Sequence, residues 1–230
     1  MYFSYNNDRQ ILSNISINVN NNDKIAIVGR TGCGKTTLVN LLCRFYDVSK
    51  GSIFINGENI NNYTLESLRE NIGYVMQDVV IFDGNIYDNI NYANKDVQKE
   101  QIETICKKLR LHDKIISFSE GYELNLNKNQ DLFSLGEKQM INFARIMVEN
   151  PSVVILDEIT SSLSYENEEL VKNAIKEITK DKICFIIAHR LTTIKSCNKI
   201  LYMENGKILE NGSHQELMDI KGKYYNLVKN

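Results

Sequence analysis

Residues 29–36 read Gly-Arg-Thr-Gly-Cys-Gly-Lys-Thr, which fits the spacing G-x-x-x-x-G-K-[ST]. In loops of this kind, backbone amides surround the phosphates of a nucleoside triphosphate, the lysine neutralises the β- and γ-phosphate oxygens, and the last hydroxyl suits Mg²⁺. The alternative is a glycine-rich turn that binds nothing. Lys35 is also expected to act in catalysis. The residues expected to bind the nucleotide are Gly29, Thr31, Gly32, Cys33, Gly34, Lys35, Thr36 and Thr37, with Thr36 also reaching the metal.

A pair of carboxylates, Asp157 and Glu158, directly follows the apolar run 153–156. An α/β sheet places its ligands at the carboxyl ends of its strands. We therefore expect Asp157 to reach the Mg²⁺ shell and Glu158 to accept a proton from a water that attacks the γ-phosphate. Such a pair also occurs as a helix cap or as solvated surface charge. The phosphate loop upstream is what favours the catalytic interpretation.

Three short apolar runs predict the strands that must position these residues. They cover residues 24–28 before the phosphate loop, 153–156 before the acidic pair, and 183–188. Continuous apolar runs bounded by turn residues are typical of strands buried on both faces. Helices are expected over residues 34–44 and 164–179. Strands separated by helices imply right-handed crossovers and a parallel sheet.

Other patterns predict antiparallel and helical pieces. Apolar and polar residues alternate over residues 15–19, which suits a strand with one buried face. Asn56-Gly57 and Asn205-Gly206 are typical of two-residue hairpin turns, because both residue types tolerate positive φ. From about residue 88 to residue 150, apolar residues instead recur at helical spacing, which predicts a helical lobe inserted between strands.

Composition excludes several classes of protein. The 230 residues include 27 Lys and Arg against 29 Asp and Glu, and this formal net charge of −2 disfavours a general nucleic-acid binder. The apolar runs are far shorter than the roughly 18–20 residues that span a bilayer. Five cysteines without metal-ligand spacing argue against a structural metal site and indicate a reducing compartment.

Five further segments accompany the two nucleotide motifs: residues 3–5 (FSY), 72–77 (IGYVMQ), 133–139 (FSLGEKQ), 160–164 (TSSLS) and 188–190 (AHR). In this order and spacing the chain resembles, over nearly its whole length, the nucleotide-binding domain of an ATP-binding cassette (ABC) transporter, of the exporter type that moves drugs, lipids or peptides. The resemblance implies an α/β fold of the P-loop NTPase (RecA-like) class. Its parallel-sheet core would carry an antiparallel β subdomain and an α-helical subdomain at about residues 78–150, all within one ATPase domain over residues 1–230.

The resemblance also implies cofactors and partners. Two such domains, identical or different, would face each other head to tail around two molecules of ATP with Mg²⁺, and hydrolysis would reopen the dimer. A transmembrane domain, expected in the same full-length chain, would use this cycle for export at the cytoplasmic face of the cell membrane. Because the chain begins close to Tyr5, we expect a further strand and membrane segments upstream.

Several single residues gain roles from the resemblance alone. Tyr5 would stack on adenine, Gln77 would approach Mg²⁺ and the attacking water, and His189 would contact the γ-phosphate. Base stacking on an aromatic ring is worth about 1–3 kcal/mol, and a neutral imidazole has one donor for a phosphate oxygen. Outside this context, each residue is more often a surface tyrosine, a loop glutamine or a strand-end histidine.

The signature segment departs from the family's usual Leu-Ser-Gly-Gly-Gln, since residues 133–137 read Phe-Ser-Leu-Gly-Glu. By resemblance, Ser134, Gly136 and Glu137 would contact the γ-phosphate held by the partner, because a helix that begins at Ser134 presents its amides there. Ser134-x-x-Glu137 is equally the pattern of a capping box, which needs no nucleotide. The carboxylate of Glu137 near a polyanion is expected to weaken closure of the dimer.

Three functions remain open on this basis. The first is an ATPase module that drives export. The second is a nucleotide-gated dimer with little or no turnover, because the altered signature segment and Ser164, where the family usually has Asp, would spoil the composite site. The third is a soluble cassette protein without a role in transport, which the near-neutral charge disfavours.

Overall fold

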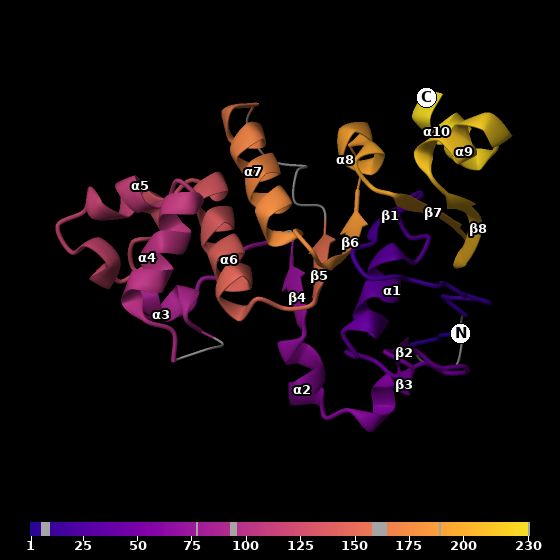
Figure 1. The fold of residues 1–230 in the computed structure, drawn as a ribbon, viewed down its shortest axis with the longest axis horizontal. Coiled ribbons are helices and arrows are strands. Elements are labelled where there is room, and N and C mark those ends of the chain that lie inside the picture. The colour runs from indigo at the N-terminus through magenta and orange to yellow at the C-terminus, as the bar shows by residue number, and fades with distance from the viewer. Residues whose placement is uncertain (6–9, 77, 93–95, 158–164, 189, 230) are drawn as a thin grey trace. The chain divides into compact units, whose positions relative to one another are not determined.

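The computed structural model describes residues 1–5, 10–76, 78–92, 96–157, 165–188 and 190–229 (Figure 1). The chain divides into two compact units. The first, here called the sheet unit, comprises Met1–Ile72, Ser152–Glu158 and Asp181–Asn230, and the second, the helical unit, comprises Gly73–Pro151 and Ile159–Lys180.

The core of the sheet unit is a mainly parallel sheet. Its strands run in the order β5 (Val153–Asp157), β6 (Ile183–Ile187), β1 (Lys24–Val28), β7 (Lys199–Glu204) and β8 (Lys207–Gly212). The first four are parallel and buried at nearly every central position, as continuous apolar runs require. β8 pairs antiparallel with β7 and alternates between exposed and half-buried positions, so one of its faces meets solvent.

Both predicted hairpins are present in the sheet unit. β2 (Phe54–Ile55) pairs antiparallel with β3 (Glu58–Asn59), and the turn residues Asn56 and Gly57 have φ of 53° and 81°. The turn between β7 and β8 has φ of 49° at Asn205 and 73° at Gly206. Positive φ at both central residues matches the twist of the strands, which is why Asn-Gly is favoured there.

Short helices complete the sheet unit. They are α1 (Lys35–Leu42), α2 (Leu65–Glu70), α8 (Leu191–Lys195), α9 (His214–Ile220) and α10 (Lys223–Lys229), with the 3₁₀ turn η1 (Ile60–Asn62). The last two helices follow β8 at the C-terminal end of the chain (Figure 1). Ser213 and Glu216 form a capping box at the start of α9, and the carboxylate of Glu210 accepts the backbone amides of Lys223 and Tyr224 at the start of α10.

Helices dominate the second unit. It contains α3 (Ile86–Ile90), α4 (Lys99–Lys108), α5 (His112–Ile116), α6 (Leu135–Glu149) and α7 (Tyr165–Ile178), with the 3₁₀ turns η2 (Gly121–Glu123) and η3 (Gln130–Leu132). The strand β4 (Ile72–Val75) begins at the division between the units. Ile102, Ile105, Ile141 and Ala144, which recur at helical spacing, are all buried.

A buried polar network centres on Arg145 of α6. Its guanidinium donates to the carbonyl of Asn89 at 2.7 Å, to the side-chain oxygen of Asn89 at 2.9 Å and to the carbonyl of Val80 at 2.8 Å. Burial lowers the pKa of Arg145 to about 10. Because a buried cation is costly unless it is fully hydrogen-bonded, the network fixes the segment around Val80 against α3 and α6.

The sequence predicted this α/β fold and its parallel core correctly, and one strand wrongly. Residues 15–19 form no strand, although their burial alternates as expected, with Ile15 buried and Ser16 and Asn18 exposed. A strand needs a hydrogen-bonded neighbour as well as an alternating pattern, and β1 already pairs with β6 and β7 on its two sides. Among the residues that the structure describes, every helix is too short or too polar to cross a membrane.

Candidate nucleotide-binding site

The phosphate loop joins the end of β1 to the start of α1, the context that its motif requires. Gly29 has φ of 149°, and a Cβ there would lie 2.2 Å from the carbonyl oxygen of Met203. Gly34, with φ of 107°, is the N-terminal cap residue of α1. Only glycine fits the first position, because β7 passes directly beside it.

Lys35 is held inside the loop by the loop's own backbone. Its side chain is buried, with 6% of the residue exposed, and its Nζ donates to the carbonyl of Gly29 at 3.0 Å and to that of Arg30 at 3.3 Å. The loop's own backbone therefore positions the ammonium group. Exchange of two carbonyls for phosphate oxygens would strengthen its interactions, because the attraction between opposite charges is added to the hydrogen bonds.

The loop fits an anion. A Cβ placed on Gly32 would meet no atom within 4 Å, so the space beside this glycine is open. Thr31 and Thr36 are exposed. The helix α1 has no side-chain cap and no acidic residue in its first turn. The sequence of α1 itself therefore supplies no carboxylate that would compete with a phosphate for its amides or for the positive end of its dipole.

Strand register brings Asp157 to the same edge of the sheet. Asp157 of β5 pairs with Ile187 of β6, and Ile187 pairs with Ile27 of β1, which lies two residues before Gly29. Neighbouring strands are about 4.8 Å apart, so the backbone of Asp157 lies about 10 Å from that of Ile27. A half-buried carboxylate and the hydroxyl of Thr36 are the few protein oxygens that Mg²⁺ requires when it keeps several waters.

Tyr5 lies beside α1 and is tied to it. The hydroxyl of Tyr5 shares a hydrogen bond of 3.1 Å with that of Thr37, which is buried. Of the surface of Tyr5, 44% is exposed, and its ring is in edge contact with Tyr46 at a centroid distance of 4.9 Å. The helix α1, which follows the phosphate loop, thus also holds the exposed ring of Tyr5 through Thr37.

The signature segment lies in the helical unit and starts α6. Ser134 caps this helix, because its side chain accepts the amide of Glu137 at 3.3 Å and the carboxylate of Glu137 accepts the amide of Ser134 at 2.7 Å. The capping box predicted from the sequence is therefore present. Ser134 is exposed, Glu137 is half-buried and Gly136 is buried.

Several residues predicted to take part in the site lie outside the described residues. They are Gln77, Glu158, Ser164 and His189. The described part of the sheet unit thus brings together the phosphate loop, Tyr5 and Asp157, while Ser134, Gly136 and Glu137 belong to the other unit.

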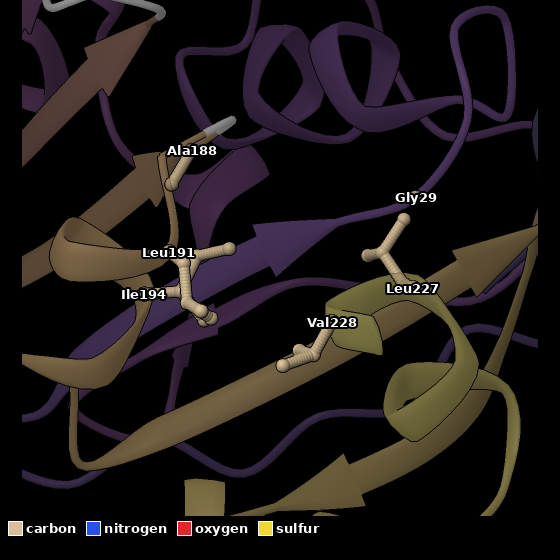
Figure 2. A pocket seen from close by; sticks show the side chains of 6 residues that line it. All are labelled: Gly29, Ala188, Leu191, Ile194, Leu227 and Val228. Atoms are coloured by element: carbon tan, nitrogen blue, oxygen red, sulfur yellow. The ribbon is translucent and has the colours of Figure 1, made fainter. Parts of the chain in front are cut away.

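A cavity of about 140 Å³ is lined in part by Gly29 of the phosphate loop (Figure 2). Gly29 and Ala188 line it together with two residues of α8, Leu191 and Ile194, and two of α10, Leu227 and Val228. The lining residues that belong to the described part of the chain have uncharged side chains. The C-terminal helix α10 therefore contributes to the surroundings of Gly29.

Two residues near the site were not predicted from the sequence. Met203 sets the space available to Gly29, and Tyr46 contacts Tyr5. The adjacent aromatic residues Phe45 and Tyr46, which lie shortly after α1 and are exposed, were the sequence signal that could have indicated the contact of Tyr46 with Tyr5. The role of Met203 depends on the pairing of β7 with β1, which residue types alone do not reveal.

Comparisons with known proteins support the family resemblance. A family model described as "ABC transporter" matches residues 12–161. The chain is 42% identical over 226 residues to the "Putative multidrug export ATP-binding/permease protein YgaD" of Bacillus subtilis, covering 98% of this chain and 39% of that protein. It is 40% identical over 225 residues to the mitochondrial "Iron-sulfur clusters transporter ABCB7" of Oryzias latipes, covering 98% of this chain and 30% of that protein.

A solved structure agrees with this likeness. The structure titled "Structure of a bacterial Atm1-family ABC exporter with ATP bound" matches with a TM-score of 0.90 and 34% identity, over 99% of this chain and 40% of that one. The chain thus spans well under half the length of these relatives. Since one family model covers most of it and the identities exceed a third of the aligned residues, the chain belongs to the ABC transporter family.

Proposed function

We propose that the chain is the ATP-binding and hydrolysing module of an ABC exporter. One observation carries this proposal: the open phosphate loop, the buried Lys35 and Asp157 share one edge of a parallel sheet. Ligands of α/β sheets bind at this edge. The likeness to exporters over nearly the whole chain supports the choice within the family.

In this proposal the loop residues bind the triphosphate of ATP. The amides after Gly29 and Gly34 would surround the phosphates, and Lys35 would leave the two loop carbonyls to pair with the β- and γ-phosphate oxygens. Thr36 and Asp157 would hold Mg²⁺. When bound, Mg²⁺ neutralises charge on the transferred phosphoryl group.

The remaining site residues are proposed to orient the attacking water. Glu158 would accept its proton, Gln77 would help to hold the water and the metal, and His189 would donate to the γ-phosphate. Phosphoryl transfer depends mainly on positioning and on charge compensation, so each of these residues would act by orienting a reactant or by stabilising charge.

The proposed partner is a second domain of the same kind, from an identical or a different chain. Ser134, Gly136 and Glu137 of one domain would face the ATP held by the other. A transmembrane domain in the same full-length chain would receive the motion at the cytoplasmic face of the membrane, and the relatives have additional length that could contain such a domain. We also propose that residues of about 78–150 act as the helical subdomain of this module.

The capping box favours a second candidate function. Because Ser134 and Glu137 satisfy each other's amides, the start of α6 is stable without a phosphate. A dimer that closes on ATP but turns it over slowly, or not at all, would follow if this box resists rearrangement.

Replacement of Glu158 by Gln separates the two functions. The ATPase proposal expects steady phosphate release by the wild-type chain in MgATP and a loss of at least about a hundredfold in Glu158→Gln, with ATP binding retained. Tight ATP binding without phosphate release by the wild-type chain would favour the nucleotide-gated dimer. Absence of ATP binding would contradict both.

A further inference from the structure

Tyr46 packs against the ring that is proposed to meet the base of ATP. Its ring is perpendicular to that of Tyr5, with an interplanar angle of 85° and centroids 4.9 Å apart. Phe3 contacts both, at 4.9 Å from Tyr5 and 5.8 Å from Tyr46. Edge-to-face contact at this spacing is the favoured geometry of aromatic pairs.

Phe3, Tyr5 and Tyr46 form one compact cluster, because each ring contacts both of the others. Phe3 is 3% exposed, whereas Tyr5 and Tyr46 are 44% and 47% exposed. Phe3 therefore anchors the cluster in the core, and Tyr46 supports Tyr5 at the surface.

Within the described residues, the hydroxyl of Tyr5 makes a single hydrogen bond. This bond, to the hydroxyl of Thr37, fixes the tip of the ring but leaves rotation about the ring axis free. A perpendicular neighbouring ring restricts that rotation, because turning the ring of Tyr5 would break the edge-to-face contact between the two rings. Preorganisation of a binding ring raises affinity by lowering the entropy lost on binding.

We propose that Tyr46 is a positioning residue for the nucleotide base: it holds the ring of Tyr5 in the orientation that stacks on adenine. Tyr46 itself need not touch the nucleotide. This inference rests on the proposed function, in which Tyr5 contacts the base of ATP. It predicts that the ring of Tyr46 matters and that its hydroxyl does not.

The experiment compares two probes, MgATP and magnesium tripolyphosphate, which share the phosphate chain and differ in the nucleoside. Calorimetry would measure both affinities for the 230-residue chain and for Tyr46→Ala, Tyr46→Phe and Tyr5→Ala. Phe54→Ala serves as the control, because Phe54 is an aromatic residue of the same unit, 62% exposed, on the hairpin strand β2.

Tyr46→Ala should bind MgATP roughly three- to tenfold more weakly, since an aromatic pair contributes about this factor to an equilibrium constant. Tripolyphosphate affinity should change less than about twofold, and Tyr46→Phe should bind both probes as the wild type does. Phe54→Ala should leave both unchanged.

Two outcomes would overturn the inference while leaving the proposed base contact standing. One is a Tyr46→Ala chain with unaltered MgATP affinity when Tyr5→Ala has lost it. The other is an equal loss of both probes in Tyr46→Ala, which would indicate a general effect on the fold. If Tyr5→Ala also leaves the ratio of the two affinities unchanged, the base contact in the proposed function is itself wrong.

Discussion

Two helices in this molecule, α1 and α6, treat the unpaired backbone amides of their first turns in opposite ways. The start of α1 follows a glycine and has neither a capping side chain nor an acidic residue in its first turn. The start of α6 has both, since Ser134 and Glu137 cap it reciprocally. In the described part of the chain, no side chain caps the amides of α1, whereas those of α6 have a protein partner. An open helix start can bind an anion directly, whereas a capped one must exchange or share its protein partner to do so.

The start of α9 has the same kind of capping box as the start of α6, so such a box can cap a helix without a nucleotide. At α9, the carboxylate of Glu216 accepts the amide of Ser213 at 2.7 Å, and Ser213 accepts the amide of Glu216 at 3.3 Å. The box at α6 has these same two distances. If Ser134 acts on the nucleotide, its substitution must therefore have an effect on activity that the matching substitution of Ser213 lacks.

The largest effect is expected at the open helix start. Lys35→Ala removes the ammonium group that the loop holds ready, and ATPase activity should fall at least about a hundredfold, as when a preorganised donor to a developing charge is lost. Phosphate release under saturating MgATP measures this. The melting temperature should change little, because water can replace the amine at the carbonyls of Gly29 and Arg30. Activity close to that of the wild type would remove Lys35 from the proposed chemistry.

Two alanine substitutions test why the open loop needs its glycines. Gly29→Ala would place a Cβ 2.2 Å from the carbonyl oxygen of Met203, and we expect a loss of about 2–3 kcal/mol in the free energy of unfolding. Gly32→Ala meets no atom within 4 Å and should cost about 1 kcal/mol, from its φ of 78° alone. Urea unfolding of both variants measures the difference. Equal losses would show that steric contact with β7 is unimportant.

Matched serine substitutions compare the two boxes. Ser134→Ala and Ser213→Ala should each lower the free energy of unfolding by about 1 kcal/mol, the usual cost of a lost cap. If Ser134 also binds the partner's phosphate, only Ser134→Ala should lower ATPase activity, by about tenfold, the effect of one hydrogen bond to a charged group. Unfolding curves and ATPase assays on both variants give the answer.

Equal ATPase activity in the two serine variants would contradict a nucleotide role of Ser134. It would leave the box at α6 as a cap alone. A loss of activity in Ser213→Ala as large as that in Ser134→Ala would have the same meaning, because α9 is not part of the proposed composite site.

The smallest effect is expected at Glu137. Glu137→Gln removes a negative charge near the proposed position of the partner's phosphates, so ATP-driven dimerisation should strengthen severalfold in a Glu158→Gln background, where the proposed hydrolysis is blocked. Glu216→Gln in the same background is the control and should leave dimerisation unchanged. Analytical ultracentrifugation with MgATP measures the dimer fraction. An unchanged dimer fraction in Glu137→Gln would refute the electrostatic argument.

Local pattern was enough to predict much of the fold. The strands β1, β5 and β6 are short apolar runs, and both hairpins contain Asn-Gly. The start of α6 was readable as well, because a capping box is formed by residues three positions apart. The hairpins and the capping box depend on residues a few positions apart, and the strands depend on burial, which can be predicted from runs of apolar residues.

Other features depend on partners distant in the sequence and could not be predicted in this way. Residues 15–19 alternate like a strand but form none, because pairing depends on which strand lies beside them. The retention of Lys35 by the loop carbonyls and the contact of Tyr46 with Tyr5 arise from the folded geometry. The motif identified the phosphate loop, but it could not predict the contacts that Lys35 makes with the loop carbonyls or the approach of Met203 to Gly29.

Titration calorimetry of the 230-residue chain with ATP and Mg²⁺ tests the central claim most directly. The phosphate loop, with its uncapped helix start and its ready ammonium group, predicts saturable heat of binding that disappears in Lys35→Ala. No heat from the folded wild-type chain, or the same heat from Lys35→Ala, would contradict the claim that this loop binds the triphosphate.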